Sequence, residues 1–568
     1  MYNITSMTTI IFQAKKKKFK KVKKTQTVNQ NKILPELSDE INFLLTKYQK
    51  ILSNELEDGK KPTLKVGEVF SSVAYAYERL RNMIDYKGDH LLVRNAIFRI
   101  LTRRLWHNLA ENPTKVSLGL VKELIWARYL KNDSIPESRV DEIAKVLAKY
   151  QYLLLDLITK YPRASQKYLY WKDRIVELCS CEIELLLYPE LAFSDDLAQG
   201  MQNWFLKNYT WDDSDLTDDA KNEQIYIAIN KSLLKSDDAR VRFRLLNKLN
   251  PEWGNTKKFS DQEIQTISAI DEVLHSPLQR HLFRFIQKRT APFQILKSLF
   301  LENKHNTKEI IGDPEKFNSE ITRLADLRYS EVRTKVNTGI TRSIIYIFIT
   351  KMLLAMAVEY PYEKFIIQSI SWLPITINLL FPPSFMFIVG MAIKKPGEQD
   401  TKILLERISG FVSPKKDESK KHFSLKLAKG EGIWDEVFLF LYTSLSLLIL
   451  LMVTLTLRQI GFNFLSIAIF FLFTSTVLLF GFRIRYTAGE YRMTTEREGL
   501  AAHLFSLLTL PFLRLGVIFS QTISRFNFLI LIMDFIFEAP IKNIVAVVDE
   551  WGGYIRRKQE EVIEVPQD

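Results

Sequence analysis

The sequence predicts an all-α protein: an irregular cytoplasmic helical domain followed by a polytopic α-helical membrane domain of four to six spans. The first observation is a change of composition near residue 340, where a charged, amphipathic chain gives way to long apolar stretches. The second is the scarcity of glycine before residue 330, where apolar residues recur at intervals of three and four. The third is a clustering of lysine and arginine in alternate connections between the apolar stretches.

The lysine-rich run KKKKFKKVKK at residues 15–24, which contains no arginine, predicts a disordered basic arm over residues 1–36. No apolar core follows the run, which is the reverse of the order in a secretory signal. Each lysine near an anionic membrane contributes about 1 kcal/mol, so the arm is a candidate contact with anionic headgroups. A solvated arm is the alternative. The candidate residues are Lys15, Lys16, Lys17, Lys18, Lys20, Lys21, Lys23 and Lys24.

The cytoplasmic helical domain is expected in two parts, residues 37–206 and 207–335, with the Asp-rich stretch 207–222 as the internal boundary. The clearest apolar stripe runs from Val140 to Leu157, and no run favours a strand. Whether the two parts form one domain or two stays open.

Local signals mark helix starts and exclude a disulfide framework. Ser134 with Glu137 predicts a capping box, and Asp313 before Pro314 predicts a second helix start. Cys179 and Cys181 lie two residues apart in a helical run, so they point to different faces and are interpreted as core thiols.

A basic stripe follows one predicted helix. Arg280, Arg284 and Lys288 recur every four residues, so they share a face that could contact lipid phosphates. A solvated helix face is the alternative. Because the chain carries no helix-turn-helix, zinc-finger or RNA-binding signature, nucleic acid is an unlikely partner. Arg240, Arg242 and Arg244 lie two apart and spread around their helix.

The membrane domain is predicted over residues 336–540, because a bilayer core requires about 20 apolar residues in a helix. The expected spans are 343–358, 366–393, 436–457, 463–482, 502–520 and 526–540. Pro382 and Pro383 predict a break or kink of the second span around Phe381 to Ser384. The last two segments carry charges and could instead lie in the interface, which would leave four spans.

Basic residues predict the orientation. The loop 394–433 carries 10 lysines and arginines, whereas the alternate connections carry one each: Lys364, Arg458 and Arg525. Both termini are therefore expected in the cytoplasm. Residues 541–568 are expected to form an amphipathic surface helix and tail.

Ionisable residues within apolar spans are the main candidates for a functional site. They are Lys351, Arg514, Asp534 and Glu538, and pairing of either basic residue with Asp534 would offset the cost of burying it. The functional interpretation is a proton or ion relay. The alternative is that Lys351 extends to the interface and the carboxylates mark a shallow helix.

No catalytic, cofactor or metal-binding motif is apparent. The seven histidines are scattered, and no P-loop, dinucleotide fingerprint or nucleophile elbow occurs. Glu359, Glu363 and Lys364 are interpreted as the only polar group in the short outer connections. A non-enzymatic protein without a cofactor or metal is therefore expected.

Two segments resemble an uncharacterised group of bacterial multi-pass membrane proteins. They are SDDARVRFRLLNKLNPEW at 236–253 and LPFLRLGVIFSQTISRFNFLILIMDFIFEAPIKNIVAVVDEWGGYIRRKQEE at 510–561. The resemblance implies location in a bacterial cytoplasmic membrane and supplies no activity or site.

Two functional hypotheses follow from this organisation. The first is a membrane-anchored interaction or scaffold module, whose cytoplasmic domain binds a protein partner or anionic lipid. The second is a transporter or channel for a small solute or an ion that uses the intramembrane charges. The sequence leaves the partner, the solute and the oligomeric state open.

Overall fold

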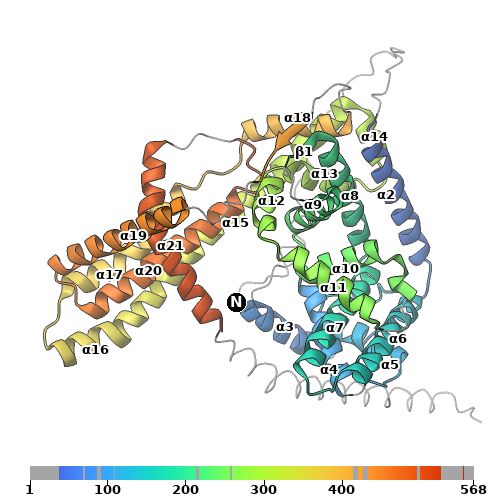
Figure 1. Cartoon of the computed structure of the whole chain (residues 1–568), viewed down its shortest axis with the longest axis horizontal. Coiled ribbons are helices and arrows are strands. Elements are labelled where there is room, and N and C mark those ends of the chain that lie inside the picture. Colours follow the sequence, from blue (N-terminus) through green and yellow to red (C-terminus); the bar gives the residue numbers. More distant parts are fainter. Residues whose placement is uncertain are drawn as a thin grey trace, which may run out of the picture. The chain divides into compact units, whose positions relative to one another are not determined.

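The computed structural model describes residues 37–67, 71–85, 91–107, 109–212, 216–255, 259–413, 420–425, 433–494, 499–525 and Tyr554. Over these ranges the chain is helical with two very short strands (Figure 1), which confirms the all-α prediction. The predicted basic arm, the segment 526–540 and, apart from Tyr554, the tail 541–568 lie outside the described residues.

The first part of the chain contains short and medium helices. They are α2 (Asp39–Asp58), α3 (Ser71–Asp85), α4 (Leu92–His107), α5 (Pro113–Trp126), α6 (Glu137–Lys160), α7 (Gln166–Leu187), α8 (Glu190–Asn208), α9 (Asp218–Leu233), α10 (Asp238–Leu249), the 3₁₀ helix η2 (Pro251–Asn255), α11 (Asp261–Leu274), α12 (Pro277–Gln287), α13 (Ala291–Glu302) and α14 (Thr307–Gly312).

Longer helices dominate the second part. They are α15 (Pro314–Leu354), the π-helices η3 (Ala355–Glu359) and η4 (Glu363–Ile367) on either side of α16 (Tyr360–Tyr362), α17 (Trp372–Met391), α18 (Glu398–Val412), α19 (Ile433–Gln459), α20 (Phe464–Ala488) and α21 (Leu500–Arg525). The strands are β1 (Tyr209–Trp211) and β2 (Lys421–Phe423).

A first hydrophobic core lies mainly among α4, α5, α6, α7, α10 and α11. The predicted stripe from Val140 to Leu157 forms the buried face of α6. Cys179 and Cys181 on α7 are buried and unbonded, as expected of core thiols. Burial raises the pKa of the Cys181 thiol to about 12, which keeps it protonated.

A second hydrophobic core is built from α2, α8, α9, α12, α13, the first half of α15 and α18. Each of the two cores takes residues from both sides of residue 207: Ile175 and Tyr226 lie in the first, and Phe193 and Leu296 in the second. The chain therefore crosses between the cores more than once, rather than completing one before 207 and the other after it.

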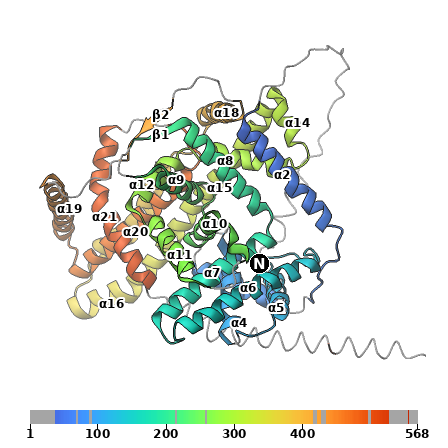
Figure 2. The ribbon, with the colours of Figure 1, turned by 45° about the vertical axis from the view of Figure 1, so that its right-hand side comes forward.

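The connection 394–433, expected to be a basic loop, contains folded elements of the second core. Leu404 and Phe411 of α18 are buried there. Strand β2 pairs in parallel with β1 (Figure 2). Trp211 of β1 stacks on Phe423 of β2, with ring centroids 5.9 Å apart. Two of the basic residues, Lys402 and Arg407, lie on the exposed face of α18, whose other face is apolar and buried.

Helix α15 joins the second core to the membrane-like part of the chain. It begins at the predicted site, where Asp313 accepts a hydrogen bond from the N–H of Glu315 and Pro314 occupies the first helical turn. The capping box predicted from Ser134 and Glu137 does not form. Helix α6 begins at Glu137 with Pro136 at the N-cap position, and the Ser134 hydroxyl donates to the carbonyl oxygen of Lys131.

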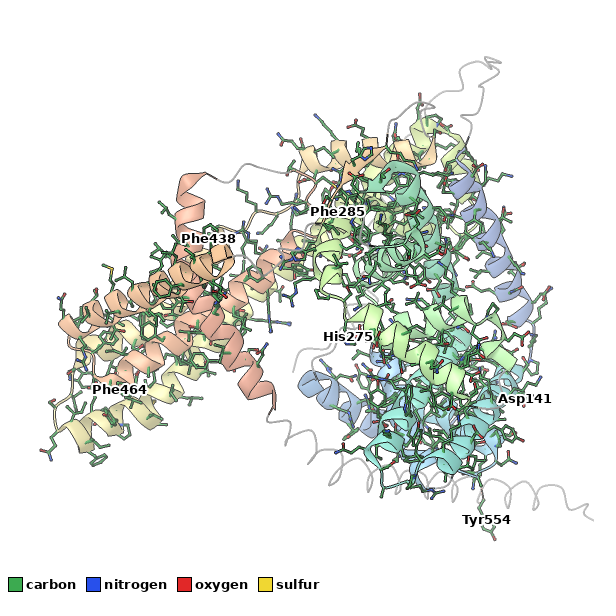
Figure 3. All side chains as sticks on the ribbon, in the orientation of Figure 1. Asp141, His275, Phe285, Phe438, Phe464 and Tyr554 are labelled. Carbon is green, nitrogen blue, oxygen red and sulfur yellow. The ribbon has the colours of Figure 1, made fainter. Side chains whose placement is uncertain are left out.

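Five helical stretches are long and apolar enough to cross a membrane within the described residues. They are Pro314–Ile367, Trp372–Met391, Glu436–Gln459, Phe464–Ala488 and Leu504–Gln521. Phe438 and Phe464, labelled in Figure 3, are 63% and 78% exposed, as expected of side chains that lipid covers. The predicted sixth span lies outside the described residues.

Of the predicted break or kink at Phe381 to Ser384, the break does not occur, and the kink stays a prediction. Helix α17 continues through Pro382 and Pro383, and Pro374 lies in its first turn, where an N–H would have no helical partner. The chain turns instead at Gln368, which adopts a φ of 60°. The irregular helical backbone lies earlier, in η3 and η4, with Pro361 between them.

The membrane helices pack closely through glycine. A Cβ atom on Gly516 of α21 would lie 2.7 Å from the carbonyl oxygen of Ser475 on α20. Only the absence of a side chain permits this approach, which is a common way for membrane helices to pack. Helix α21, expected either to span or to lie in the interface, therefore packs tightly against α20.

Asp400 fixes the connection after α20 to α18. Its carboxylate accepts hydrogen bonds from the N–H groups of Met493 at 2.7 Å, Thr494 at 2.8 Å and Gly397 at 3.0 Å. Met493 also lies in the second core. Gly397 before α18 and Met493 after α20 are therefore held together beside this core.

The contacts of Asp400 predict a pH-dependent contribution to stability. Burial alone would raise its pKa, but the hydrogen bonds from Gly397, Thr494 and Met493 hold this pKa below its ordinary value. The contribution of Asp400 to folding stability is therefore fully present above the pKa of an aspartate in the unfolded chain, about 3.9, and it is lost as the pH falls through the folded pKa.

Asp400→Asn should lower the melting temperature in detergent at neutral pH, and the difference from wild type should shrink in acid. Glu406→Gln, an exposed change on α18, is the control; an equal effect of both changes would contradict this role.

Candidate functional site

Lys351 forms a fully buried ion pair with Glu359. The Lys351 Nζ lies 2.9 Å from Glu359 Oε1, and both side chains are 0% exposed. In a regular α-helix, residues eight apart would differ in direction by about 80°. The π-helical turn η3 accommodates an extra residue and so brings Glu359 back above Lys351.

Asn378 of α17 connects this pair to α20. Its side-chain NH₂ donates to Glu359 Oε1 at 2.6 Å and to the carbonyl oxygen of Ser466 at 3.0 Å. Because both partners are acceptors, the amide must present its nitrogen to them. Asn378 and Ser466 are each 0% exposed.

Glu363 extends the polar group by one helical turn. Its Oε2 accepts a hydrogen bond from the N–H of Ser371 at 2.8 Å, and its Oε1 accepts one from the side chain of Asn463 at 2.9 Å. Asn463 in turn caps α20 by accepting from the N–H of Ser466 at 2.8 Å. The intramembrane polar cluster comprises Lys351, Glu359, Glu363, Asn378, Asn463 and Ser466.

Several polar atoms of the cluster have no hydrogen-bond partner among the described residues. They are Glu359 Oε2, Asn378 Oδ1 and Ser466 Oγ, and all three are buried. A buried oxygen without a partner is costly, so such positions typically bind water or an ion. The cluster therefore has unused hydrogen-bonding capacity next to the charged pair.

The cluster lies against an apolar wall. The Lys351 ammonium is 5.1 Å from the ring centre of Phe473, and Ile347, Met386 and Val477 are buried nearby in the same helical packing. Removing two charges from water costs several kcal/mol per ion, and their mutual attraction rarely exceeds this cost. The pair is therefore an expensive feature of the membrane domain.

The structure describes two of the four predicted intramembrane residues, Lys351 and Arg514, and gives them different partners. Arg514 is exposed and its guanidinium lies 4.3 Å from the ring centre of Tyr442 on α19. Asp534 and Glu538 lie outside the described residues, so their pairing stays a prediction. The partner that the structure gives Lys351 is Glu359, which the sequence had indicated for an outer connection.

From the sequence, Glu359 and Glu363 are assigned to an outer connection because the first span is expected to end at 358. Asn378, a neutral residue inside the expected second span, is not singled out. The continuation of the helix to Ile367 puts Glu359 and Glu363 in buried positions. The signal was the apolar run after Lys364, which is typical of a helix that has not yet left the membrane.

The predicted basic stripe is exposed on α12. Arg280, Arg284 and Lys288 all have exposed side chains. The lysines of the predicted basic arm lie outside the described residues.

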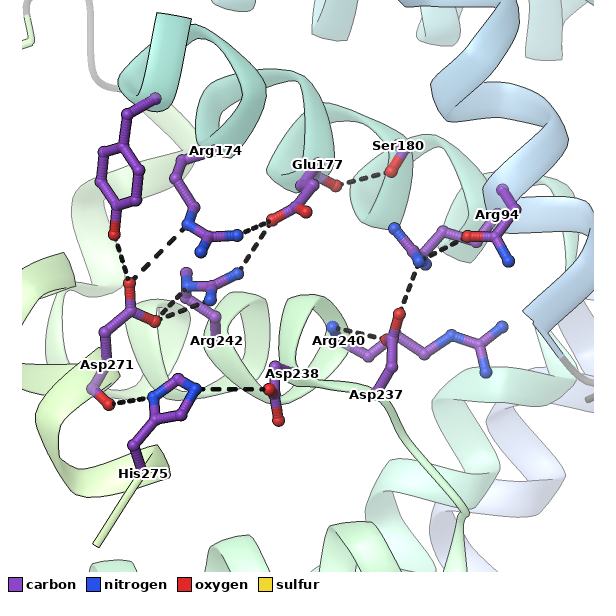
Figure 4. Close-up of polar contacts among 12 residues, drawn as sticks. Arg94, Arg174, Glu177, Ser180, Asp237, Asp238, Arg240, Arg242, Asp271 and His275 are labelled. Carbon is purple, nitrogen blue, oxygen red and sulfur yellow. Dashed lines mark hydrogen bonds and ion pairs between the residues drawn. The ribbon is translucent and has the colours of Figure 1, made fainter. Parts of the chain in front are cut away.

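A second group of charges lies in the first core and is internally paired (Figure 4). Arg242 contacts Asp271 at 2.7 Å and Glu177 at 3.0 Å, and Arg240 donates to Glu184 at 2.9 Å. The two arginines thus take different partners, as their spacing predicts. An open cavity of about 260 Å³ adjoins the group, lined by Arg174, Glu177, Asp237, Asp238, Ala239, Arg242 and His275. These pairings cross-link α7, α10 and α11 and are interpreted as structural.

Comparisons of the chain with models of protein families, with curated proteins and with solved structures found no match. The resemblance to bacterial multi-pass membrane proteins stays a prediction.

Breaking the buried pair should be more harmful than replacing it. Lys351→Met leaves Glu359 buried without its counter-charge, at a cost of roughly 3–5 kcal/mol, so the melting temperature and folded yield should fall. The double change Lys351→Met with Glu359→Gln should recover most of the loss, because the glutamine oxygen can still accept from Asn378. Lys364→Met, at an exposed lysine, is the control, and thermal unfolding in detergent is the measurement. A double variant as unstable as the single one would contradict the pairing.

Proposed function

We propose that the membrane domain transports a small ion and that the Lys351–Glu359 pair carries a proton during the cycle. The observation that supports the proposal is the complete burial of both charged side chains, 2.9 Å apart, among apolar helices. Charged residues in membrane segments are costly, and pumps and transporters retain them as proton and ion carriers.

The chemistry of the pair fits a proton-carrying step. When the N–H bond of the Lys351 ammonium breaks and an O–H bond forms on Glu359, an ion pair becomes a neutral pair without loss or gain of atoms. The two forms differ in charge separation, so the group can respond to an ion or water that binds at the open Glu359 Oε2.

The backbone offers a way to couple this step to movement. The π-helical turns η3 and η4 each hold an extra residue compared with an α-helix. Conversion of η3 to α-helix would rotate Glu359 by about 100° and separate it from Lys351. Such irregular helices occur frequently at functional sites.

We further propose that the chain resides in the cell membrane with its helical domain in the cytoplasm. This proposal is supported by the buried residues of α18 and by Met493, which lie in the second core and come from the two lysine- and arginine-rich connections. Basic residues prefer the cytoplasmic side, so the side of the second core is assigned to the cytoplasm.

Proteoliposomes test the transport proposal. Purified full-length chain is reconstituted with a pH-sensitive dye inside the vesicles, and an ion or potential gradient is imposed. Wild-type vesicles should show proton flux above that of empty vesicles. Glu359→Gln, which preserves shape but removes the charge, should abolish the flux, whereas the exposed change Lys364→Met should preserve it. Full activity of folded Glu359→Gln would exclude this carboxylate as the carrier.

An interaction module is the second candidate function. It is favoured by the unbroken helix α15, which joins the large second core directly to the membrane helices. Two results together would establish this function instead. Reconstituted vesicles would show no ion flux above that of empty vesicles, and the full-length chain would retain one stoichiometric protein partner through gel filtration.

A further inference from the structure

The basic stripe of α12 faces the end of a membrane helix. Gln287 lies three residues after Arg284 and seven after Arg280, so the three residues share one helical face. The Gln287 side chain donates a hydrogen bond to the Tyr486 hydroxyl on α20. The stripe is therefore directed towards the part of α20 that contains Tyr486.

This part of α20 marks the level at which the membrane ends. Arg483 is the first ionisable residue of α20 after a run of 19 residues from Phe464 to Phe482. Arg483 and Tyr486 are exposed and, three residues apart, share a face. Tyrosine and arginine are typical of the headgroup level of a bilayer.

A third element adds another positive charge. Arg407 of α18 is exposed, and its guanidinium approaches the carbonyl oxygen of Lys288 at 3.5 Å and the sulfur of Met493 at 3.3 Å. We name this surface the basic juxtamembrane face. It comprises Arg280, Arg284, Lys288, Arg407 and Arg483.

The face concentrates positive charge without an internal counter-charge. Within the part of the chain that the structure describes, no carboxylate forms an ion pair with any of its five members. This differs from Arg240 and Arg242, which are paired with acids in the first core. Clustered like charges repel, so an anion that reaches several of them at once is bound favourably.

We propose that the basic juxtamembrane face binds the headgroup of an anionic phospholipid. Its depth at the end of α20 and its charge both match a lipid phosphate. A bound headgroup would join α12 of the soluble part to α20 of the membrane part. This inference requires only that α20 crosses the bilayer, and it is independent of ion transport.

Lipid-dependent stabilisation of the full-length protein tests the proposal. The chain is purified in a mild detergent, and its melting temperature is measured with added phosphatidylglycerol or phosphatidylcholine. Phosphatidylglycerol should stabilise the wild type more than phosphatidylcholine. The triple variant Arg280→Gln, Arg284→Gln and Lys288→Gln should weaken the apparent lipid affinity roughly fivefold per residue, or on the order of a hundredfold in total.

A matched variant controls for net charge. Lys145→Gln, Arg163→Gln and Lys167→Gln also remove three exposed basic residues, from α6, α7 and the turn between them, beside the first core. This variant should respond to phosphatidylglycerol as the wild type does. Arg483→Gln alone provides a second test from the α20 side, and it should weaken the response without any change in α12.

Several results would overturn the proposal. One is that phosphatidylglycerol raises the melting temperature of the α12 triple variant as much as that of the wild type. Another is that both triple variants lose the same share of this response. A third is that inorganic phosphate stabilises the protein as strongly as phosphatidylglycerol. The last result would identify a site for a free anion. Displacement of phosphatidylglycerol by a short RNA at an equal phosphate concentration would identify a nucleic-acid surface instead.

Discussion

The continuity of α15 is the constraint on which the rest of the structure depends. Its 41 residues form one helix, which is about 60 Å long at 1.5 Å per residue. Phe317 and Tyr329 near its start are buried in the second core, whereas Ile347 and Lys351 near its end are buried among the membrane helices. A rigid helix cannot adjust one end without displacing the other, so the two environments must accommodate a single axis.

Buried charges have different surroundings in the first core and in the membrane domain. In the first core, Arg242 is 1% exposed but contacts carboxylates on two other helices, which cross-links the fold. In the membrane domain, Glu359 satisfies one oxygen with Lys351 and Asn378 and leaves the other without a partner among the described residues. Carboxylates on two helices hold the Arg242 guanidinium in place, whereas the other oxygen of Glu359 can accept an additional ligand.

The class of the fold was accessible from the sequence because it depends on periodicity and hydropathy. The stripe on α6, the start of α15 at Asp313 and the apolar lengths of α19 and α20 all follow local rules and are found as expected. The failures concern features that depend on distant contacts. The segment 394–433 was expected to be a loop because of its many basic residues, and composition alone does not reveal that the apolar residues of α18 share one face with a partner.

The site was only partly predictable for the same reason. Lys351 stood out as a charge within an apolar run, so it could be identified alone. Its partner Glu359 could not, because the π-helical turn that directs Glu359 towards Lys351 changes the angular register of the helix. Asn378 carries no charge, so nothing in the sequence selects it. Its role depends on the packing of α17 against α20, which brings it between Glu359 and Ser466.

The composition of the second core has a consequence for biosynthesis. Leu404, Phe411, Phe423 and Met493 belong to this core but follow the first membrane spans in the chain. A chain is made from its N-terminus, and its domains generally fold in that order. The first core lacks this requirement, because its residues end at Leu274. The two cores are therefore expected to form in two stages: the first can form once Leu274 has been made, and the second is complete only after α17 and α20 have been synthesised.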